Sequence, residues 1–128
     1  MKDWADKKGE SGELKGNNLP SDTSIFDPVL CEICYKWFNI DGGVILDPFA
    51  GGSVRGIVAN VLGYDYTGID LSERQIQANY DNANELVCDM NKLKWINDDS
   101  LNVDKYIDDE SVDMIFTCPP YYDLEVYR

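Results

Sequence analysis

Residues 44–53 read VILDPFAGGS. The stretch opens with a short apolar run, VIL, of the kind that is buried on both faces of a parallel sheet. Gly51 and Gly52 then form a turn, and apolar residues at helical spacing follow from residue 54 onward. A strand, a glycine-containing turn and a helix start let the backbone approach a ligand closely and aim helix N-terminal amides at it. The stretch therefore predicts a site for the polar part of a nucleotide-like ligand.

Strands and helices alternate along the rest of the chain as well. The apolar patterns predict strands over residues 44–46, 66–70, 94–96 and 112–117. Helices are predicted over residues 27–38, 54–62, 72–84 and 101–107. This alternation predicts an α/β fold, a Rossmann-like, doubly wound sheet of parallel strands with helices on both faces. Because four strands make only a small sheet, we expect the chain to be incomplete, the front part of a larger domain.

Several predicted helices carry capping residues at their ends. Asp27 can cap the first helix, and Pro28 suits its first turn. Ser72 with Gln75 makes a capping box for a later helix, and Gly63 stands where a C-terminal cap belongs. The apolar face predicted for the first helix consists of Leu30, Ile33, Cys34 and Trp37.

A CxxC pair in the first helix, Cys31 and Cys34, has an alternative interpretation as a metal or redox site. A structural zinc site needs about four ligands, but the chain has no histidine, and Cys88 and Cys118 form no second pair. A redox pair normally opens a helix after a strand, whereas these two lie inside a helix, on or near its apolar face. We interpret both as core cysteines and expect no metal site.

The composition excludes several classes of function. The 128 residues include 24 acidic and 11 basic side chains, and the net charge of -13 falls entirely outside residues 1–20. A surface that binds a nucleic-acid duplex needs basic residues, so any grip on DNA is expected to lie mostly outside this chain. The absence of histidine excludes Ser-His-Asp triads and imidazole bases. No apolar run approaches the roughly 20 residues that span a membrane, and the first residues lack an apolar signal core, so we expect a cytoplasmic protein.

Acidic residues follow the predicted strands at the edge where such sheets bind ligands. Asp47 ends the first strand, and Asp70 ends the second, 23 residues later, a spacing at which a carboxylate binds ribose hydroxyls. Asp99 and Ser100 follow the third strand, where a carboxylate can accept a hydrogen bond from an adenine amine. Simpler alternatives stay open. In these alternatives the glycines of residues 51–52 only make a tight turn, Asp70 only caps the next helix, and Asp99 and Ser100 are ordinary loop residues.

Residues 118–121, CPPY, form the most specific motif of the chain. Two prolines end the fourth strand and fix the backbone, which leaves the carbonyls of Cys118 and Pro119 without sheet partners. Tyr121 is then held at the ligand-binding edge beside a fixed acceptor, an arrangement that suits a planar base carrying an amine. The alternative is a Pro-Pro stop with Tyr121 in a minor core. The motif follows the fourth strand at the same edge of the sheet as the turns after the earlier strands, and this position favours a ligand-binding site.

Together these motifs resemble class I S-adenosylmethionine-dependent methyltransferases, and among them the DNA amino-methyltransferases of bacteria and phages, which modify adenine N6 or cytosine N4. Residues 47–53 are similar to the glycine motif of that family, and residues 118–121 to its catalytic motif. Residues 23–28, TSIFDP, resemble the segment that precedes the glycine motif and helps to cover the methionine end of the cofactor. The resemblance runs from about residue 23 to residue 127, and its specificity comes from the order and spacing of the motifs.

The resemblance implies a role for each matching residue. The residues implied in binding S-adenosylmethionine are Ser24, Phe26, Asp47, Phe49, Gly51, Gly52, Asp70, Leu71, Asp99 and Ser100. Among them Asp70 would bind the ribose and Asp99 the adenine. The catalytic residues implied are Cys118, Pro119, Pro120 and Tyr121.

Within the catalytic motif, Tyr121 would stack on a flipped-out base, and the Pro119 carbonyl and the Cys118 position would accept the two protons of the target amine. Positioning and electrostatics would then do most of the catalysis. No general base would be needed before the transfer, in agreement with the missing histidine.

Two positions depart from the family pattern. Ser53 stands where the family usually has the second glycine of its motif, and Cys118 replaces the usual Asp, Asn or Ser. We expect residues 1–22 to form a flexible polar arm and residues 23–128 to form a methyltransferase domain that stops after the catalytic motif. The strands and the target-recognition region that follow in the family are absent from the sequence.

The resemblance thus predicts an enzyme, a site-specific DNA methyltransferase acting on the exocyclic amine of adenine or cytosine. Methylation of RNA or of a protein glutamine is an alternative within the same fold, because those enzymes share a Pro-Pro-Tyr motif. A cofactor-binding or assembly module without catalysis of its own is the alternative from a different class. The sheet edge left after the fourth strand predicts pairing with a partner chain or with a missing C-terminal half.

Overall fold

The computed structural model describes residues 26–119 of the chain. Its elements are, in order, α2 (Pro28–Phe38), β1 (Val44–Asp47), α3 (Val54–Val61), β2 (Asp65–Asp70), α4 (Glu73–Glu85), β3 (Leu93–Asn97), the 3-10 helix η1 (Ser100–Lys105) and β4 (Met114–Ile115). The four strands pair in parallel in the order β3-β2-β1-β4. The predicted α/β fold with a parallel sheet is therefore confirmed.

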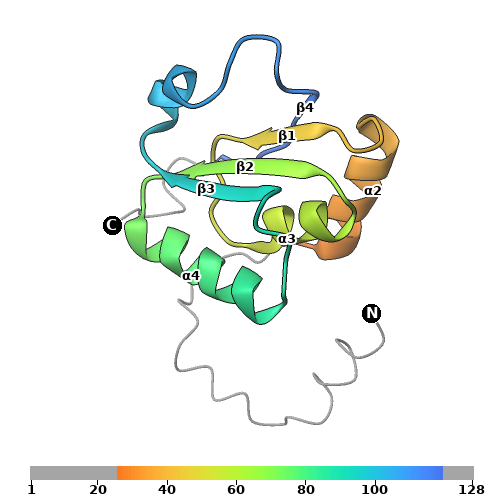
Figure 1. The fold of residues 1–128 in the computed structure, drawn as a ribbon, viewed down its shortest axis with the longest axis horizontal. Helices are drawn as coiled ribbons and strands as arrows, with labels where there is room; N and C mark the ends of the chain where they lie inside the picture. The colour runs from red at the N-terminus through yellow and green to blue at the C-terminus, as the bar shows by residue number, and fades with distance from the viewer. Residues whose placement is uncertain (1–25, 120–128) are drawn as a thin grey trace, which may run out of the picture.

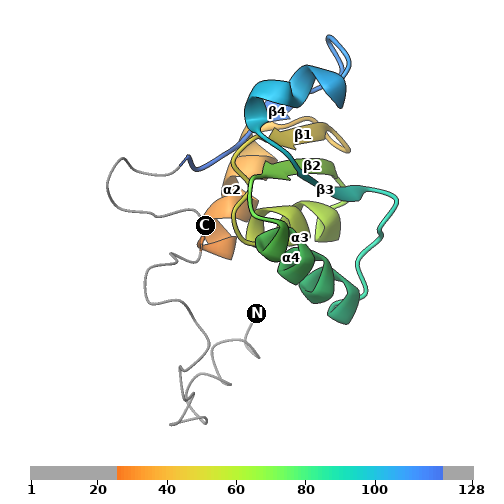
Figure 2. The ribbon, with the colours of Figure 1, turned by 90° about the vertical axis from the view of Figure 1, so that its left-hand side faces the viewer.

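The two faces of the sheet are covered unequally. Helices α2, α3 and α4 lie together on one face, and only η1 and its loops cover the other (Figure 1 and Figure 2). The larger core cluster, on the helical side, includes the fully buried Tyr35 and Ile45. On the other side Leu46, Ile69 and Ile96 pack only against Val103, Ile107 and Val112. This thin layer agrees with the expectation of an incomplete fold.

The helix caps follow the sequence. The Asp27 carboxylate accepts a hydrogen bond from the Val29 amide at 2.9 Å, and Pro28 occupies the first turn of α2. The Ser72 hydroxyl accepts from the Gln75 amide at 3.2 Å, which is half of the predicted capping box. The Gln75 side chain donates instead to Asn79, one helical turn farther along α4, so the reciprocal half of the box is missing.

The predicted apolar face of α2 is wrong. Cys31 and Tyr35 are fully buried, whereas Leu30 and Trp37 are 50% and 76% exposed. Hydrophobic residues occur on several sides of this helix, so their spacing does not single out the inward one. Tyr35 can point inward because its hydroxyl donates a hydrogen bond to the Arg55 carbonyl at 2.8 Å. The interpretation of Cys31 as a core residue holds, and burial raises the pKa of its thiol to about 11.

The predictions for the last two elements need correction. The segment after β3 is a 3-10 helix over Ser100–Lys105 and not a helix over residues 101–107. The strand predicted over residues 112–117 shortens to Met114–Ile115, paired with β1. It stops early because the next residue along β1 that could donate to it is Pro48, which has no N–H. Beyond that point Thr117 hydrogen-bonds through its side chain, to Asp47 and to the Phe49 amide.

Candidate functional site

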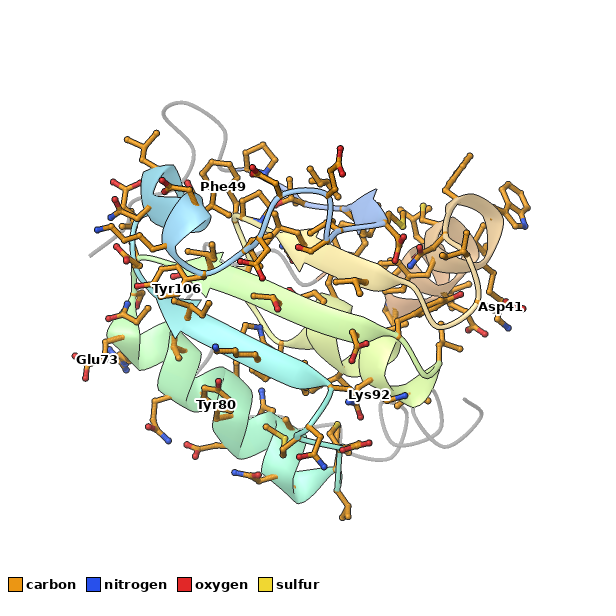
Figure 3. All side chains as sticks on the ribbon, turned by 45° about the horizontal axis from the view of Figure 1, so that its top comes forward. Asp41, Phe49, Glu73, Tyr80, Lys92 and Tyr106 are labelled. Carbon is orange, nitrogen blue, oxygen red and sulfur yellow. The ribbon has the colours of Figure 1, made fainter. Side chains whose placement is uncertain are left out.

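Residues 47–53, here named the glycine loop, connect β1 to α3 at the carboxyl end of the sheet. Figure 3 shows Phe49 and Tyr106 toward this end and Asp41 and Lys92 toward the opposite one. Gly51 has a φ of +55°, a left-handed conformation that glycine adopts at little cost. The Ala50 amide donates to the Ile69 carbonyl at 3.0 Å, which ties the loop to the neighbouring strand β2.

Asp47 lies under the glycine loop with no exposed surface. One carboxylate oxygen, Oδ2, accepts from Arg55 Nε at 2.7 Å and from the Tyr66 hydroxyl at 2.6 Å. The other, Oδ1, accepts from the Thr117 hydroxyl at 2.6 Å. Burial and the neighbouring Asp47 charge raise the pKa of Tyr66, which stays protonated and donating. Among the residues implied in cofactor binding, Asp47 is therefore an internal anchor whose side chain faces protein donors.

Arg55 is the first of two residues in this region that sequence reasoning missed. The residue is only 6% exposed. Besides its bond to Asp47, its guanidinium donates to the carbonyls of Phe49 and Ala50 at 2.9 and 2.8 Å. Burial by itself lowers the pKa of Arg55, but the charge of Asp47 and its hydrogen bond, together with smaller contributions from other neighbours, outweigh burial and raise the pKa. The guanidinium also lies 5.0 Å from the centre of the Phe26 ring. The signal in the sequence that could have identified Arg55 is its single charge among the apolar residues at the start of α3.

The other side of the glycine loop is held from β2 and α4. Asp70 is 7% exposed and accepts from the Gly51 amide at 2.9 Å and from the Ser72 amide at 2.8 Å. The side-chain amide of the fully buried Asn79 donates to the Gly51 carbonyl at 2.8 Å. Burial raises the pKa of Asp70 above its ordinary value, although the two amide donors oppose the shift. Asp70 thus holds both the glycine loop and Ser72, the N-cap residue of α4.

Beside these anchors the loop presents an open surface. Phe49 and Leu71 are 41% and 62% exposed. A Cβ added at Gly52 would meet no heavy atom within 4 Å. The anchored polar groups and the exposed apolar side chains therefore lie next to each other at one end of the sheet.

Asp99 and Ser100 adjoin this surface at the end of β3. The Asp98 amide donates to the Asp70 carbonyl at 3.1 Å, which brings the two strand ends together. The Asp99 carboxylate accepts from the Leu101 amide at 2.9 Å and caps η1, and Ser100 is the first residue of that helix. The second missed residue is Asp98, whose pKa is lowered by hydrogen bonds from Tyr106, from Asn102 and from the next backbone amide.

The structure describes only the first half of the predicted catalytic motif, residues 118–119. Cys118 and Pro119 are exposed, one and two residues after Thr117, which is bonded to the glycine loop. Phe26 packs edge-on against Phe116, with the ring centres 5.6 Å apart. Three predicted site residues, Ser24, Pro120 and Tyr121, lie outside the described residues, as does the predicted arm.

Two shallow depressions occur elsewhere on the described part of the chain. One of about 490 Å³ lies on the outer side of α4, and one of about 290 Å³ lies between η1 and the thinly covered sheet face. Neither is lined by residues of the glycine loop.

Residues 26–119 show neither a metal-binding cluster nor a membrane-spanning helix. These residues contain no group of three or more His, Cys, Asp and Glu side chains placed to hold a metal ion. Among the helices described, none has the length and apolar character needed to cross a membrane.

Comparisons with known proteins identify the fold. No protein-family model and no curated protein matches the sequence. An rRNA methylase from Streptococcus thermophilus matches with a TM-score of 0.54 and 16% identity, over 67% of this chain and 47% of that one. An RNA methyltransferase from Salinibacter ruber, in complex with S-adenosyl-L-homocysteine, matches with a TM-score of 0.57 and 15% identity, over 74% and 60%. This chain spans about half the length of the solved methylases it matches first. The described residues have the parallel-sheet fold of these methyltransferases, in part.

Proposed function

We propose that this chain carries the cofactor loop and the start of the catalytic segment of an S-adenosylmethionine-dependent methyltransferase. The observation that supports the proposal best is the linkage at the carboxyl end of the sheet. Thr117, which leads into Cys118 and Pro119, is bonded to the glycine loop by two hydrogen bonds. A cofactor-binding loop and a substrate-binding segment must be held against each other for methyl transfer, because the reacting atoms must be in contact.

The described residues fit this cofactor. Each Asp70 oxygen accepts one amide hydrogen bond and retains a lone pair for a ribose hydroxyl. The open space above Gly52 lets a ligand approach the backbone, and the exposed side chains of Phe49 and Leu71 offer apolar contacts. Asp99 and Ser100, at the adjoining strand end, are the residues proposed for the adenine. When bound, S-adenosylmethionine supplies a methyl group activated by its sulfonium.

The catalytic segment would orient the target amine. We propose that the Pro119 carbonyl accepts one proton of the amine in a hydrogen bond and that the Cys118 position accepts the other. Held in this way, the nitrogen lone pair is less delocalised into the base and more nucleophilic. Tyr121 would stack on the base, and Pro120 would keep the segment rigid. No general base is needed before the transfer, in accord with the absence of histidine. The surplus proton left on the methylated nitrogen would pass to water afterwards.

DNA is the first substrate we propose, because the order and spacing of the glycine and catalytic motifs resemble DNA amino-methyltransferases. RNA is the second, and the observation that favours it is that the solved structures matching this fold include proteins named as RNA methyltransferases. A net charge of -13 gives this chain little attraction for either polyanion, so other protein regions would supply the contacts to phosphate. A cofactor-binding module without catalysis is the remaining candidate.

We also propose that another polypeptide segment completes the sheet. β4 lies at an edge of the sheet, and the side chain of Ile115 is 64% exposed there. Unpaired strand edges present backbone donors and acceptors to any segment that can add a strand. The segment would come from a partner chain or from the C-terminal half of a longer protein.

The first test is a calorimetric titration of this chain with S-adenosyl-L-homocysteine, whose affinity does not depend on turnover. We expect Asp70→Asn to weaken binding by about tenfold or more, because the substitution removes a charged acceptor. Asp65→Asn, at the opposite end of β2, is the matched control and should bind as the parent does. Equal binding by both variants would count against the proposed ribose contact, and no binding by the folded parent would count against the function.

The substrate class is tested by methyl transfer from labelled S-adenosylmethionine to a panel of duplex DNA, single-stranded RNA and a glutamine-containing peptide. The panel uses the longest natural form of the protein, or this chain with its partner. We expect labelled N6-methyladenine or N4-methylcytosine in DNA and loss of transfer in Tyr121→Ala, with cofactor binding retained. Transfer to RNA alone would select the second candidate, and binding without any transfer would select the non-catalytic module.

A further inference from the structure

The hydroxyl of Thr117 has two hydrogen bonds whose directions are fixed by chemistry. A carboxylate has no proton to give, so Thr117 must donate to Asp47 Oδ1, at 2.6 Å. A backbone N–H has no acceptor, so the same oxygen must accept from the Phe49 amide, at 3.0 Å. One hydroxyl therefore connects the end of the fourth strand to two residues of the glycine loop that lie about 70 positions earlier.

This hydroxyl replaces the backbone ladder at the point where the ladder ends. The last ladder contact between β1 and the β4 segment runs from the Phe116 amide to the Leu46 carbonyl, at 3.2 Å. In the register of this ladder Thr117 comes opposite Pro48, which has no N–H to continue it. The Thr117 side chain makes the next link instead, to Asp47. The register between the glycine loop and the segment that enters the catalytic motif therefore depends on a side chain.

The glycine loop receives the contact at a residue that is otherwise held from the opposite side. The Phe49 carbonyl accepts from Arg55, while the Phe49 amide donates to Thr117. Arg55 also binds Asp47, so the two anchors of Phe49 meet at the same buried carboxylate. The Phe49 side chain, 41% exposed, remains free to meet a ligand. A shift of Phe49 on ligand binding would thus be transmitted through Thr117.

We propose that Thr117 is a positioning residue that couples the glycine loop to Cys118, so that a ligand bound on the loop is sensed at the start of the catalytic segment. The coupling of loop and segment is a property of the chain alone. The use made of it, alignment of the cofactor with the target amine, rests on the proposed function. Thr117 touches neither reacting atom in this arrangement and acts through the two elements that it joins.

The test uses backbone amide NMR of this chain with three variants. Thr117→Val keeps the shape but removes both hydrogen bonds, and Thr117→Ser keeps the hydroxyl. Thr67→Val removes the hydroxyl of a threonine in the middle of β2 that makes no side-chain hydrogen bond among the described residues. Without ligand, we expect the Phe49 amide to exchange with solvent about tenfold faster in Thr117→Val, and at the parent rate in the other two variants.

The second measurement follows the Cys118 amide resonance during titration with S-adenosyl-L-homocysteine. In the parent and in Thr117→Ser the resonance should move with the same saturation curve as the Gly51 and Gly52 resonances. In Thr117→Val it should stay still while those loop resonances continue to move. A Cys118 response in Thr117→Val equal to that of the parent would overturn the proposal.

Failure of the proposed function gives a different pattern. If the parent does not bind the ligand, the function is contradicted, and the exchange rate of the Phe49 amide still decides the coupling. An unchanged rate in Thr117→Val would overturn the coupling itself.

Discussion

The ion pair of Asp47 and Arg55 is expected to be the most sensitive point of the fold. Asp47 is fully buried, and Arg55 is its one cationic partner among the described residues, with its guanidinium also bound to two loop carbonyls. Arg55→Met preserves the length and apolar stem of the side chain but removes the charge and all three hydrogen bonds. The variant must then keep a carboxylate buried with only two hydroxyl donors, those of Tyr66 and Thr117.

The expected loss of stability is large. Removing one partner of a buried ion pair costs about 3–5 kcal/mol, because the other charge stays desolvated and unpaired. Small domains unfold with a free energy of about 5–15 kcal/mol, so Arg55→Met should lose a major part of the stability. Arg55→Lys should lie between the parent and Arg55→Met, because an ammonium restores the charge but not the fork that reaches both loop carbonyls. Arg74→Met, on the exposed side of α4, should change stability by less than about 0.5 kcal/mol.

The assay is urea unfolding at neutral pH, followed by circular dichroism, of the parent, these variants, Asp47→Asn and the double variant. If the two charges act as a pair, the double variant should lose less than the sum of Arg55→Met and Asp47→Asn, by about 1–3 kcal/mol. Strict additivity, or a loss in Arg55→Met no larger than in Arg74→Met, would refute the argument.

Three more predictions follow from the core and the loop. Gly56→Ala should destabilise by about 1–3 kcal/mol in thermal unfolding, because the new Cβ would lie 2.6 Å from Trp95 Cζ2, and unchanged stability would contradict this packing. Gly52→Ala should leave stability within about 0.5 kcal/mol but weaken S-adenosyl-L-homocysteine binding in calorimetry, and parental affinity would show that no ligand approaches this backbone. Asp70 has a raised pKa in the folded state, so the folded state binds a proton more readily than the unfolded state. As pH rises from about 3.9, the pKa of Asp in the unfolded chain, through the higher folded pKa, the parent should therefore lose stability relative to Asp70→Asn. Urea unfolding of both proteins across this interval measures the change, and a stability difference that does not vary with pH would refute the shift.

The strands and helices were predictable because their signals are local. The run of residues 44–46 and the glycines after it predict β1 and its turn from ten consecutive residues, and Asp27 and Ser72 cap the helices that follow them. The sheet order β3-β2-β1-β4 also agrees with a simple alternation of strands and helices. The resemblance of the motifs further predicted a methyltransferase fold, and the match to solved methyltransferases confirms that fold.

The errors occurred where packing chooses among local options. In α2, apolar residues surround most of the helix, and only contact with α3 and the sheet selects Cys31 and Tyr35 as the buried side. In β4, the sequence from residue 112 to 117 has strand character throughout. It forms only two paired residues, because the neighbouring strand β1 runs into Pro48, which has no N–H to continue the ladder.

The sequence by itself determined which segments are strands and helices and which residues stand at the carboxyl ends of the strands, since these properties depend on neighbours within a few positions. Only the tertiary structure decided what those residues do. Asp47 is an internal anchor because its partners Arg55, Tyr66 and Thr117 come from 8, 19 and 70 positions away. The sequence shows an aspartate in either case, whether its carboxylate faces solvent or three buried donors. The difference arises from desolvation, and desolvation is a property of the packed chain.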